Sequence, residues 1–235
     1  MTTEVPHRLH LGCGLTAPEG WLNVDGSLQV VLARRPWLKR LLVFTGILPP
    51  KQAAIPWRPS VVRLDLTRPL PYPTGSFSAV YSSHLLEHLY HDQALALLKE
   101  CHRVLRPGSV CRVVVPDLEA LVGDYSKAKA AGDVNAASML MESMLMHDKG
   151  PRRGLLGHFY RITAFHQHKW MYDAASLMQM FTDAGFRSVD TWFEQTFVIE
   201  PYSTFSDAFV VWSRPVASAE HVASGHPQTA DTALL

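Results

Sequence analysis

The chain has 235 residues, 47% of them apolar, which is enough to bury one substantial core, and we predict a single domain. Its formal net charge of +1 gives no overall electrostatic attraction to nucleic acid. Neither an amino-terminal apolar signal segment nor a run near the roughly 18 apolar residues of a membrane span is present. With three cysteines at no metal-like spacing, these features predict a reduced, cytoplasmic protein.

Residues 8–25 are the most informative stretch of the sequence. A short apolar strand runs into Gly12 and Gly14, and a second strand over residues 21–24 ends at Asp25. Glycines at the carboxyl end of a strand let a ligand lie against the backbone, because no Cβ holds it away. A carboxylate that closes the next strand can accept hydrogen bonds from both hydroxyls of a ribose. The stretch therefore predicts a nucleoside-cofactor site at the edge of an open α/β sheet.

The spacing within this stretch separates two cofactor classes. Gly12 to Ala17 formally fits the dinucleotide fingerprint G-x-G-x-x-G/A. That fingerprint opens a helix whose amino terminus holds a pyrophosphate, with the ribose acid about 20 residues further on. Here Pro18 and Gly20 follow at once, and Asp25 comes only 13 positions after Gly12. An NAD(P)-type cofactor is disfavoured, and S-adenosylmethionine, which has no pyrophosphate, fits better.

Residues 28–59 are irregular, and their centre, residues 34–48, is both basic and apolar. This centre combines Arg34, Arg35, Lys39 and Arg40 with large apolar side chains such as Trp37 and Phe44. A lid or crossover helix packed on the sheet has this composition, and so does a segment that makes weak contact with a membrane surface. The sequence leaves both interpretations open.

Strands and helices alternate through the rest of the chain. Apolar runs predict strands at residues 61–64, 77–81, 111–115, 189–197 and 208–212. Helices are predicted at residues 85–105, 118–147 and 174–184, the last of them ended by Gly185. This alternation is typical of a mostly parallel sheet covered on both faces, and the last two strands suggest a terminal antiparallel hairpin. The tail over residues 215–235 has few apolar residues and is predicted to be disordered.

Five segments, in this order, resemble the class I S-adenosylmethionine-dependent methyltransferases, specifically the small stand-alone proteins of the methyltransferase type 11 kind. HLGCG resembles motif I, NVD the acidic end of the second strand, and residues 63–89 the stretch from the third strand into the helix after the fourth. Residues 98–117 are similar to the motif of the fifth strand, and residues 168–186 to the helix before the sixth. The resemblance implies an α/β, Rossmann-like three-layer sandwich with a mostly parallel seven-stranded sheet.

The resemblance also implies a domain organisation. Residues 1–214 would form the methyltransferase domain, with residues 28–59 as a lid or insertion. Residues 118–172 would form a helical insertion on the acceptor side, and the tail would lie outside the domain.

Cofactor roles follow from the same resemblance. Asp25 would hold the ribose hydroxyls, and the carboxylate of Asp65 would accept from the adenine amino group. Ser82 and Ser83 would border the methyl that is transferred. His10 stands where the family usually has an acid. The cofactor-binding residues that the resemblance implies are His10, Gly12, Cys13, Gly14, Asp25, Asp65, Leu66, Ser82 and Ser83.

His84 is the candidate base, because it follows the fourth strand at the edge of the sheet where ligands bind. The interpretation that competes with this is that His84 caps the following helix. His84-x-x-Glu87-His88 also matches the inverzincin zinc motif. We predict no metal ligands, because the sequence does not show a third one.

The predicted reaction is methylation, most simply O-methylation, of a small-molecule or glycan acceptor. Acceptor-binding candidates are Asp117, Tyr160, His166 and His168. Nucleic acid is not an expected substrate, since the chain has neither a basic patch nor an N/D-P-P-Y/F motif. A methyltransferase-like binding or scaffold protein without catalysis is the alternative that stays open.

Overall fold

The computed structural model describes residues 7–146, 167–194, 197–199, 203–205 and 208–214. Tyr160, His166 and the tail over residues 215–235 lie outside this part of the chain.

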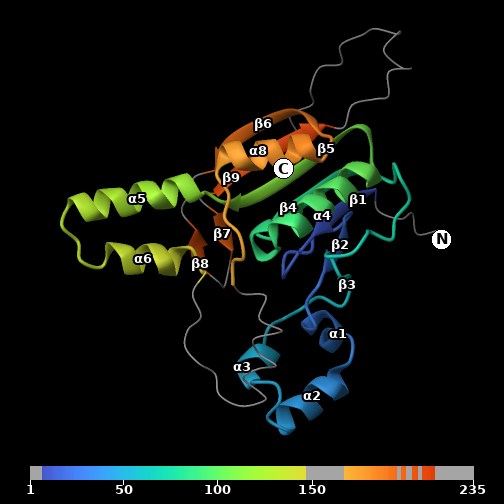
Figure 1. Ribbon diagram of the computed structural model, residues 1–235. Coiled ribbons are helices and arrows are strands. Elements are labelled where there is room, and N and C mark those ends of the chain that lie inside the picture. Colours follow the sequence, from blue (N-terminus) through green and yellow to red (C-terminus); the bar gives the residue numbers. More distant parts are fainter. Residues whose placement is uncertain (1–6, 147–166, 195–196, 200–202, 206–207, 215–235) are drawn as a thin grey trace, which may run out of the picture.

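The centre of the fold is a sheet with the strand order β3-β2-β1-β4-β5-β9-β6 (Figure 1). Five strands run parallel. They are β1 (Arg8–Leu11), β2 (Leu22–Asp25), β3 (Val62–Arg63), β4 (Phe77–Ser83) and β5 (Leu105–Pro116). The predicted Rossmann-like α/β fold with a parallel sheet is confirmed over these five strands.

The strand order changes direction between β1 and β4. From β1 the chain adds β2 and β3 toward one edge, and from β4 it adds β5 toward the other. Ligands of open α/β sheets bind outside the carboxyl ends of the strands at such a switch point. The segments that follow β1, β2 and β4 are therefore the places to look for a site.

The late strands pair antiparallel. β9 (Ala208–Arg214) pairs with β5 on one side and with β6 (Arg187–Glu194) on the other. Between β6 and β9 the chain forms β7 (Phe197–Ile199) and β8 (Ser203–Phe205), which pair with each other. The connection between these two antiparallel strands thus contains a small strand pair of its own.

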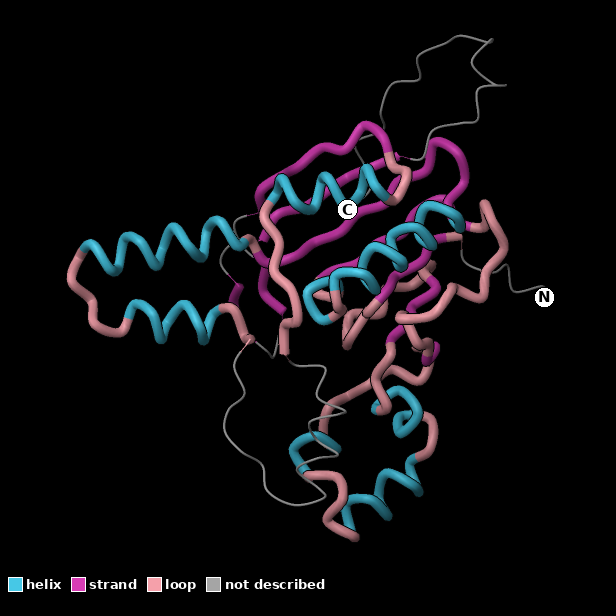
Figure 2. Tube along the Cα trace, in the orientation of Figure 1, coloured by secondary structure: helices cyan, strands magenta, loops and turns pink. Residues whose placement is uncertain are grey.

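Two helices, α4 (His91–Val104) and α8 (Ala174–Asp183), lie side by side on one face of the sheet (Figures 1 and 2). Their buried side chains join those of β1, β4 and β5 in one hydrophobic cluster. Val113, Val114 and Val115 are all buried, as the continuous apolar run of β5 predicts. The three-layer arrangement, with helices on both faces of the sheet, stays a prediction.

The helix predicted over residues 85–105 is wrong at its start. The chain instead makes a short 3-10 turn, η1 (Leu86–His88), and α4 begins only at His91. Tyr90 is extended, with φ −67° and ψ 154°, and its backbone amide donates to Oε1 of Gln93 at 3.2 Å. This contact makes Tyr90 the N-cap, three residues before Gln93, and α4 begins at the next residue, His91.

The helix predicted over residues 118–147 is two helices in the structure. α5 (Leu118–Ala130) and α6 (Ala136–Ser143) pack against each other as a hairpin that extends from the end of β5 (Figure 1). The turn between them contains Gly132 with φ +80°, a conformation that favours glycine.

Residues 28–59 contain three short helices beyond the β3 edge of the sheet (Figure 1): α1 (Gln29–Ala33), α2 (Pro36–Phe44) and α3 (Pro50–Ala53). Val30 and Val61 anchor this region in a small second cluster with Cys13 and Ala17. α2 has no buried residue. Among the described residues, no helix has both the length and the apolar character needed to cross a membrane.

Candidate active site

The loop after β1 needs its two glycines for different reasons. Both have positive φ, +62° at Gly12 and +54° at Gly14. A Cβ at Gly12 would lie 3.0 Å from Cδ1 and 3.1 Å from Cβ of Leu85, whereas a Cβ at Gly14 would have no atom within 4 Å. Gly12 therefore makes room for the turn after β4, and the space that a ligand can occupy lies at Gly14.

Asp25 ties this loop to the end of β2. Its Oδ2 accepts from the Gly14 amide at 2.9 Å, and its Oδ1 accepts from the Ser27 amide at 2.7 Å. Burial raises the pKa of Asp25 above its usual range, against the opposing effect of the two amides. The carboxylate is thus held beside Gly14, directly at the end of β2.

Asp65 and Leu66 follow β3 at the neighbouring strand end. Asp65 is exposed, accepts from the amide and hydroxyl of Thr67 at 3.1 and 2.7 Å, and pairs with Arg68 at 3.1 Å. The Thr67 hydroxyl is the main cause of the lowered pKa of Asp65. The side chain of Leu66 is buried in the main hydrophobic cluster, so only the backbone of this residue is available to contact an adenine ring.

Ser82 and Ser83 end β4 with two buried hydroxyls. Neither Oγ has a hydrogen-bond partner within the described part of the chain. Buried polar groups in proteins are almost always paired. Ser82 lies opposite Leu11 at the end of β1, and two orphaned hydroxyls at this switch point fit a site that a polar cofactor completes.

Two predicted cofactor residues are largely hidden. His10 is 3% exposed, its Nδ1 donates to Oδ1 of Asn23 at 3.2 Å, and its ring packs 4.9 Å from that of Tyr81. Burial lowers the pKa of His10 to about 4, so the ring is neutral at pH 7. Burial and the nearby Asp25 raise the pKa of the Cys13 thiol to about 12, which keeps it protonated.

His84 lies in the left-handed region, with φ +51°, at the start of the turn after β4. Its amide donates to the Val114 carbonyl at 2.9 Å, and its Nδ1 lies 3.0 Å from Oε1 of Glu87. This conformation costs roughly 1–2 kcal/mol in a residue with a Cβ. His84 does not cap α4, because that helix begins at His91.

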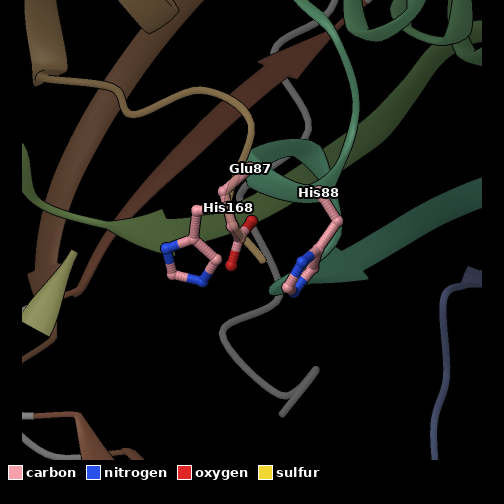
Figure 3. Close-up of side chains that lie close together, drawn as sticks. All are labelled: Glu87, His88 and His168. Carbon is pink, nitrogen blue, oxygen red and sulfur yellow. The ribbon is translucent and has the colours of Figure 1, made fainter. Parts of the chain in front are cut away.

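The turn also brings together a cluster that sequence reasoning missed. Glu87 and His88 come from the turn, and His168 comes from the segment before α8 (Figure 3). One ligand atom from each side chain lies within 4.8 Å of the others. The sequence does not show this grouping, since residue 168 comes from a distant part of the sequence and only the fold brings it here.

Burial governs the charges within this cluster. Burial lowers the pKa of His168 to about 4, although the negative charge of Glu87 acts to raise it, so this ring is neutral at pH 7. Burial acts to raise the pKa of Glu87, but the hydrogen bond from His84 and the neighbouring histidines bring it below its usual value.

Asp117 stands at the end of β5, as predicted, but as a helix cap. Its Oδ1 accepts from the Glu119 amide at 2.9 Å at the beginning of α5, and the residue is buried. The Leu118 amide donates to the Tyr172 carbonyl at 2.9 Å, which joins this strand end to the segment that carries His168.

Residues 9–113 match the model of a protein family described as methyltransferase domain. No curated protein matches the chain. Solved structures of similar fold include S-adenosylmethionine-dependent methyltransferases from three organisms. The protein from Methanosarcina mazei is 14% identical, with 90% of this chain and 92% of that chain covered and a TM-score of 0.50. The protein from Archaeoglobus fulgidus is 15% identical, with 88% and 85% covered and a TM-score of 0.48. The protein from Thermotoga maritima is 14% identical, with 88% and 80% covered and a TM-score of 0.46.

At 14% identity and a TM-score of 0.50, the Methanosarcina mazei structure shows the fold alone, and the family match adds the methyltransferase domain. The match spans the strands and turns that carry the glycine loop, Asp25, Asp65 and the two serines of β4. Residues 9–113 therefore form a methyltransferase domain, and the chain has the fold of S-adenosylmethionine-dependent methyltransferases.

Proposed function

We propose that this methyltransferase acts on a hydroxyl of a small-molecule or glycan acceptor, with His84 as the base. The observation that carries the proposal is the pair formed by His84 Nδ1 and Glu87 Oε1 at 3.0 Å, directly after the serines that end β4. A carboxylate oxygen can only accept, so Nδ1 carries the proton and the basic lone pair lies on Nε2. The family match favours an enzyme over the non-catalytic scaffold.

The residues would divide the work as follows. S-adenosylmethionine, when bound, supplies an electrophilic methyl group on a sulfonium. Gly14 leaves space for the cofactor, and the Asp25 carboxylate accepts hydrogen bonds from the ribose hydroxyls. Ser82 and Ser83 provide hydroxyl groups at the methionine end of the cofactor. His84 takes the acceptor proton, which a sugar hydroxyl requires because its pKa is far above 7.

Asp65 and Leu66 complete the cofactor side of the proposal. The Asp65 carboxylate would accept from the adenine amino group, and the Leu66 backbone would contact the ring. On the acceptor side we propose Asp117, which bridges to Tyr172 four residues after His168, and His168 itself, together with Tyr160 and His166. Residues 118–172 would be the insertion that carries this side, and residues 28–59 a second insertion.

An assay with S-adenosylmethionine carrying a deuterated methyl group tests this proposal against a panel of glycans and phenols. We expect labelled methyl on an acceptor oxygen, and His84→Ala should lower turnover by about 100-fold or more while cofactor affinity is retained. His91→Ala is the matched control, because His91 is exposed on the neighbouring helix. Full turnover of His84→Ala would remove His84 as the base.

We also propose that α2 contacts an anionic membrane surface. Trp37 is 66% exposed and Phe44 is 90% exposed, although both are large and apolar. Arg34, Arg35 and Arg63 line a hollow, and Arg35 directly precedes α2 in the chain, two residues before Trp37. Exposed aromatic side chains beside basic ones are typical of segments that bind anionic lipid.

Sedimentation with vesicles tests this contact. The protein should pellet with phosphatidylserine vesicles at low salt and much less with phosphatidylcholine vesicles. Replacing both Trp37 and Phe44 by Ser should abolish pelleting, whereas Val134→Ser, at an exposed apolar residue beyond the end of α5, should not. Equal pelleting of the double variant would contradict the proposal.

A further inference from the structure

The strongest feature outside the cofactor residues is the cluster of Glu87, His88 and His168. The two imidazole rings stand 5.0 Å apart at 70° to each other, and Figure 3 shows the Glu87 carboxylate between them. One ligand atom of each residue lies within 4.8 Å of the other two. Imidazole nitrogen and carboxylate oxygen are the donors that zinc and its neighbours in the first transition series bind in proteins.

Glu87 has one oxygen in use and one left over. The side chain is 0% exposed, and its Oε1 is held by Nδ1 of His84 at 3.0 Å. Its Oε2 is buried and has no hydrogen-bond partner in the described part of the chain. Among the ion pairs between described residues, no Lys or Arg reaches this carboxylate. A buried anion in this state calls for a cation.

His88 is oriented as a metal ligand usually is. Its Nδ1 lies 3.3 Å from the backbone carbonyl oxygen of Gln167, and a carbonyl can only accept, so Nδ1 carries the proton. The lone pair is then on Nε2. Ligating histidines commonly donate their second ring nitrogen to a carbonyl in this way, and ligating carboxylates are themselves hydrogen-bonded, as Glu87 is to His84.

The backbone holds His168 against the turn. The amides of Lys169 and Trp170 both donate to the Glu87 carbonyl, at 2.7 and 3.2 Å, and the His168 amide donates to the Leu145 carbonyl at 3.2 Å. The third side chain is therefore positioned by main-chain contacts, not by a chance rotamer. Its 4% exposure and the half-buried state of His88 leave access to the cluster from the His88 side.

We propose that Glu87, His88 and His168 bind a divalent transition-metal ion of the zinc class. Tetrahedral ligands at about 2.1 Å from the ion are roughly 3.4 Å apart, so the side chains close inward by about 1 Å on binding. Three protein ligands leave a fourth position for water or another oxygen donor. The ion would join the turn after β4 to the segment before α8, on the acceptor side of the fold.

Metal titration of the purified full-length chain, free of any histidine tag and first treated with chelator, tests the site without depending on methyl transfer. We expect one Zn²⁺ per chain, and one Co²⁺ with the visible absorption of a tetrahedral site. His88→Ala and His168→Ala should each weaken Zn²⁺ binding by at least tenfold. Glu87→Gln, which keeps the shape and removes the charge, should do the same.

His91→Ala is the matched control and should bind as the wild type does, since His91 is exposed and packs on Trp170 beside the cluster. Circular dichroism shows whether each variant is folded. If His168→Ala does not fold, His88→Gln, at a half-buried residue, tests the site in its place. Absence of stoichiometric binding by the wild type, or equal binding by folded cluster variants, would overturn the proposal. Separate titration with S-adenosylmethionine keeps such a failure distinct from a failure of the methyltransferase account.

Discussion

Single residues decide what the glycine loop can do, and Gly12 and Gly14 are its clearest contrast. At both positions an Ala incurs the strain of positive φ, roughly 1–2 kcal/mol. Only at Gly12 does the new Cβ also meet Leu85, at 3.0 Å. At Gly14 the Cβ enters the space that we assign to the cofactor.

We therefore expect the two variants to fail in different ways. Gly12→Ala should lower the melting temperature by clearly more than Gly14→Ala, because overpacking adds about 1–3 kcal/mol to the backbone strain. Gly14→Ala should remain folded and lose affinity for S-adenosylmethionine. Calorimetric melting and ligand titration measure the two effects, and equal destabilisation of the variants would contradict the assignment of space in the loop.

His10 makes the stability of the fold depend on pH. Burial lowers its pKa from 6.5 to about 4 in the folded state, so below pH 6.5 the unfolded chain binds a proton that the folded chain does not. The stabilisation is complete above the unfolded pKa and is lost as the pH falls from about 6.5 toward 4.

Chemical unfolding at pH 7.5 and at pH 5 checks this. We expect His10 to account for a loss on the order of 1–2 kcal/mol between the two pH values. His10→Gln should unfold with a smaller difference between them. A pH difference that is the same in the variant and the wild type would show that His10 does not carry it.

Among the elements, helix α8 shows most clearly how local sequence determines where a helix begins and ends. Asp173 begins α8: its Oδ1 accepts from the Ser176 amide at 2.8 Å, and the Ser176 hydroxyl returns a contact to the Asp173 amide at 3.2 Å. Gly185, with φ +99°, follows the carboxyl end. Both ends of this predicted helix are confirmed to within a residue.

Removal of this cap should be measurable. Asp173→Ala should destabilise the protein by about 1 kcal/mol, the usual cost of losing an N-cap acceptor. Asp183→Ala, at the other end of the same helix, is the control. Thermal melts at pH 7 compare the variants, and an unchanged melting temperature for Asp173→Ala would argue against the cap.

Other elements show where sequence periodicity stops being informative. The apolar pattern over residues 85–105 is continuous, yet the helix does not extend through it. Residues 86–88 form the 3-10 turn η1, in which Glu87 is buried, and α4 begins only after Tyr90. The pattern over residues 118–147 likewise hides the turn at Gly132. In both cases packing between distant segments overrides a local preference for helix.

The same limit applies to the site. Gly14, Asp25 and the serines of β4 could be assigned because each follows a strand within one stretch of sequence. His168 could not be joined to Glu87, because the contact depends on hydrogen bonds from Lys169 and Trp170 to the Glu87 carbonyl. The only sequence signal was the His84-x-x-Glu87-His88 motif itself.

In the whole molecule, the predicted cofactor residues come together at the switch point of the sheet. β1, β2 and β4 end beside one another, so the glycine loop, Asp25 and the β4 serines meet although they are far apart in the chain. The central claim is that this meeting point binds S-adenosylmethionine through the carboxylate of Asp25.

Calorimetric titration of the wild type and of Asp25→Ala with S-adenosylmethionine, S-adenosylhomocysteine and NADH tests that claim most directly. The account predicts that the wild type binds the first two and not NADH, and that the variant binds them about 1–3 kcal/mol more weakly, since charge-assisted hydrogen bonds to the ribose are lost. Binding of NADH alone, or equal affinity of S-adenosylmethionine for both proteins, would contradict it.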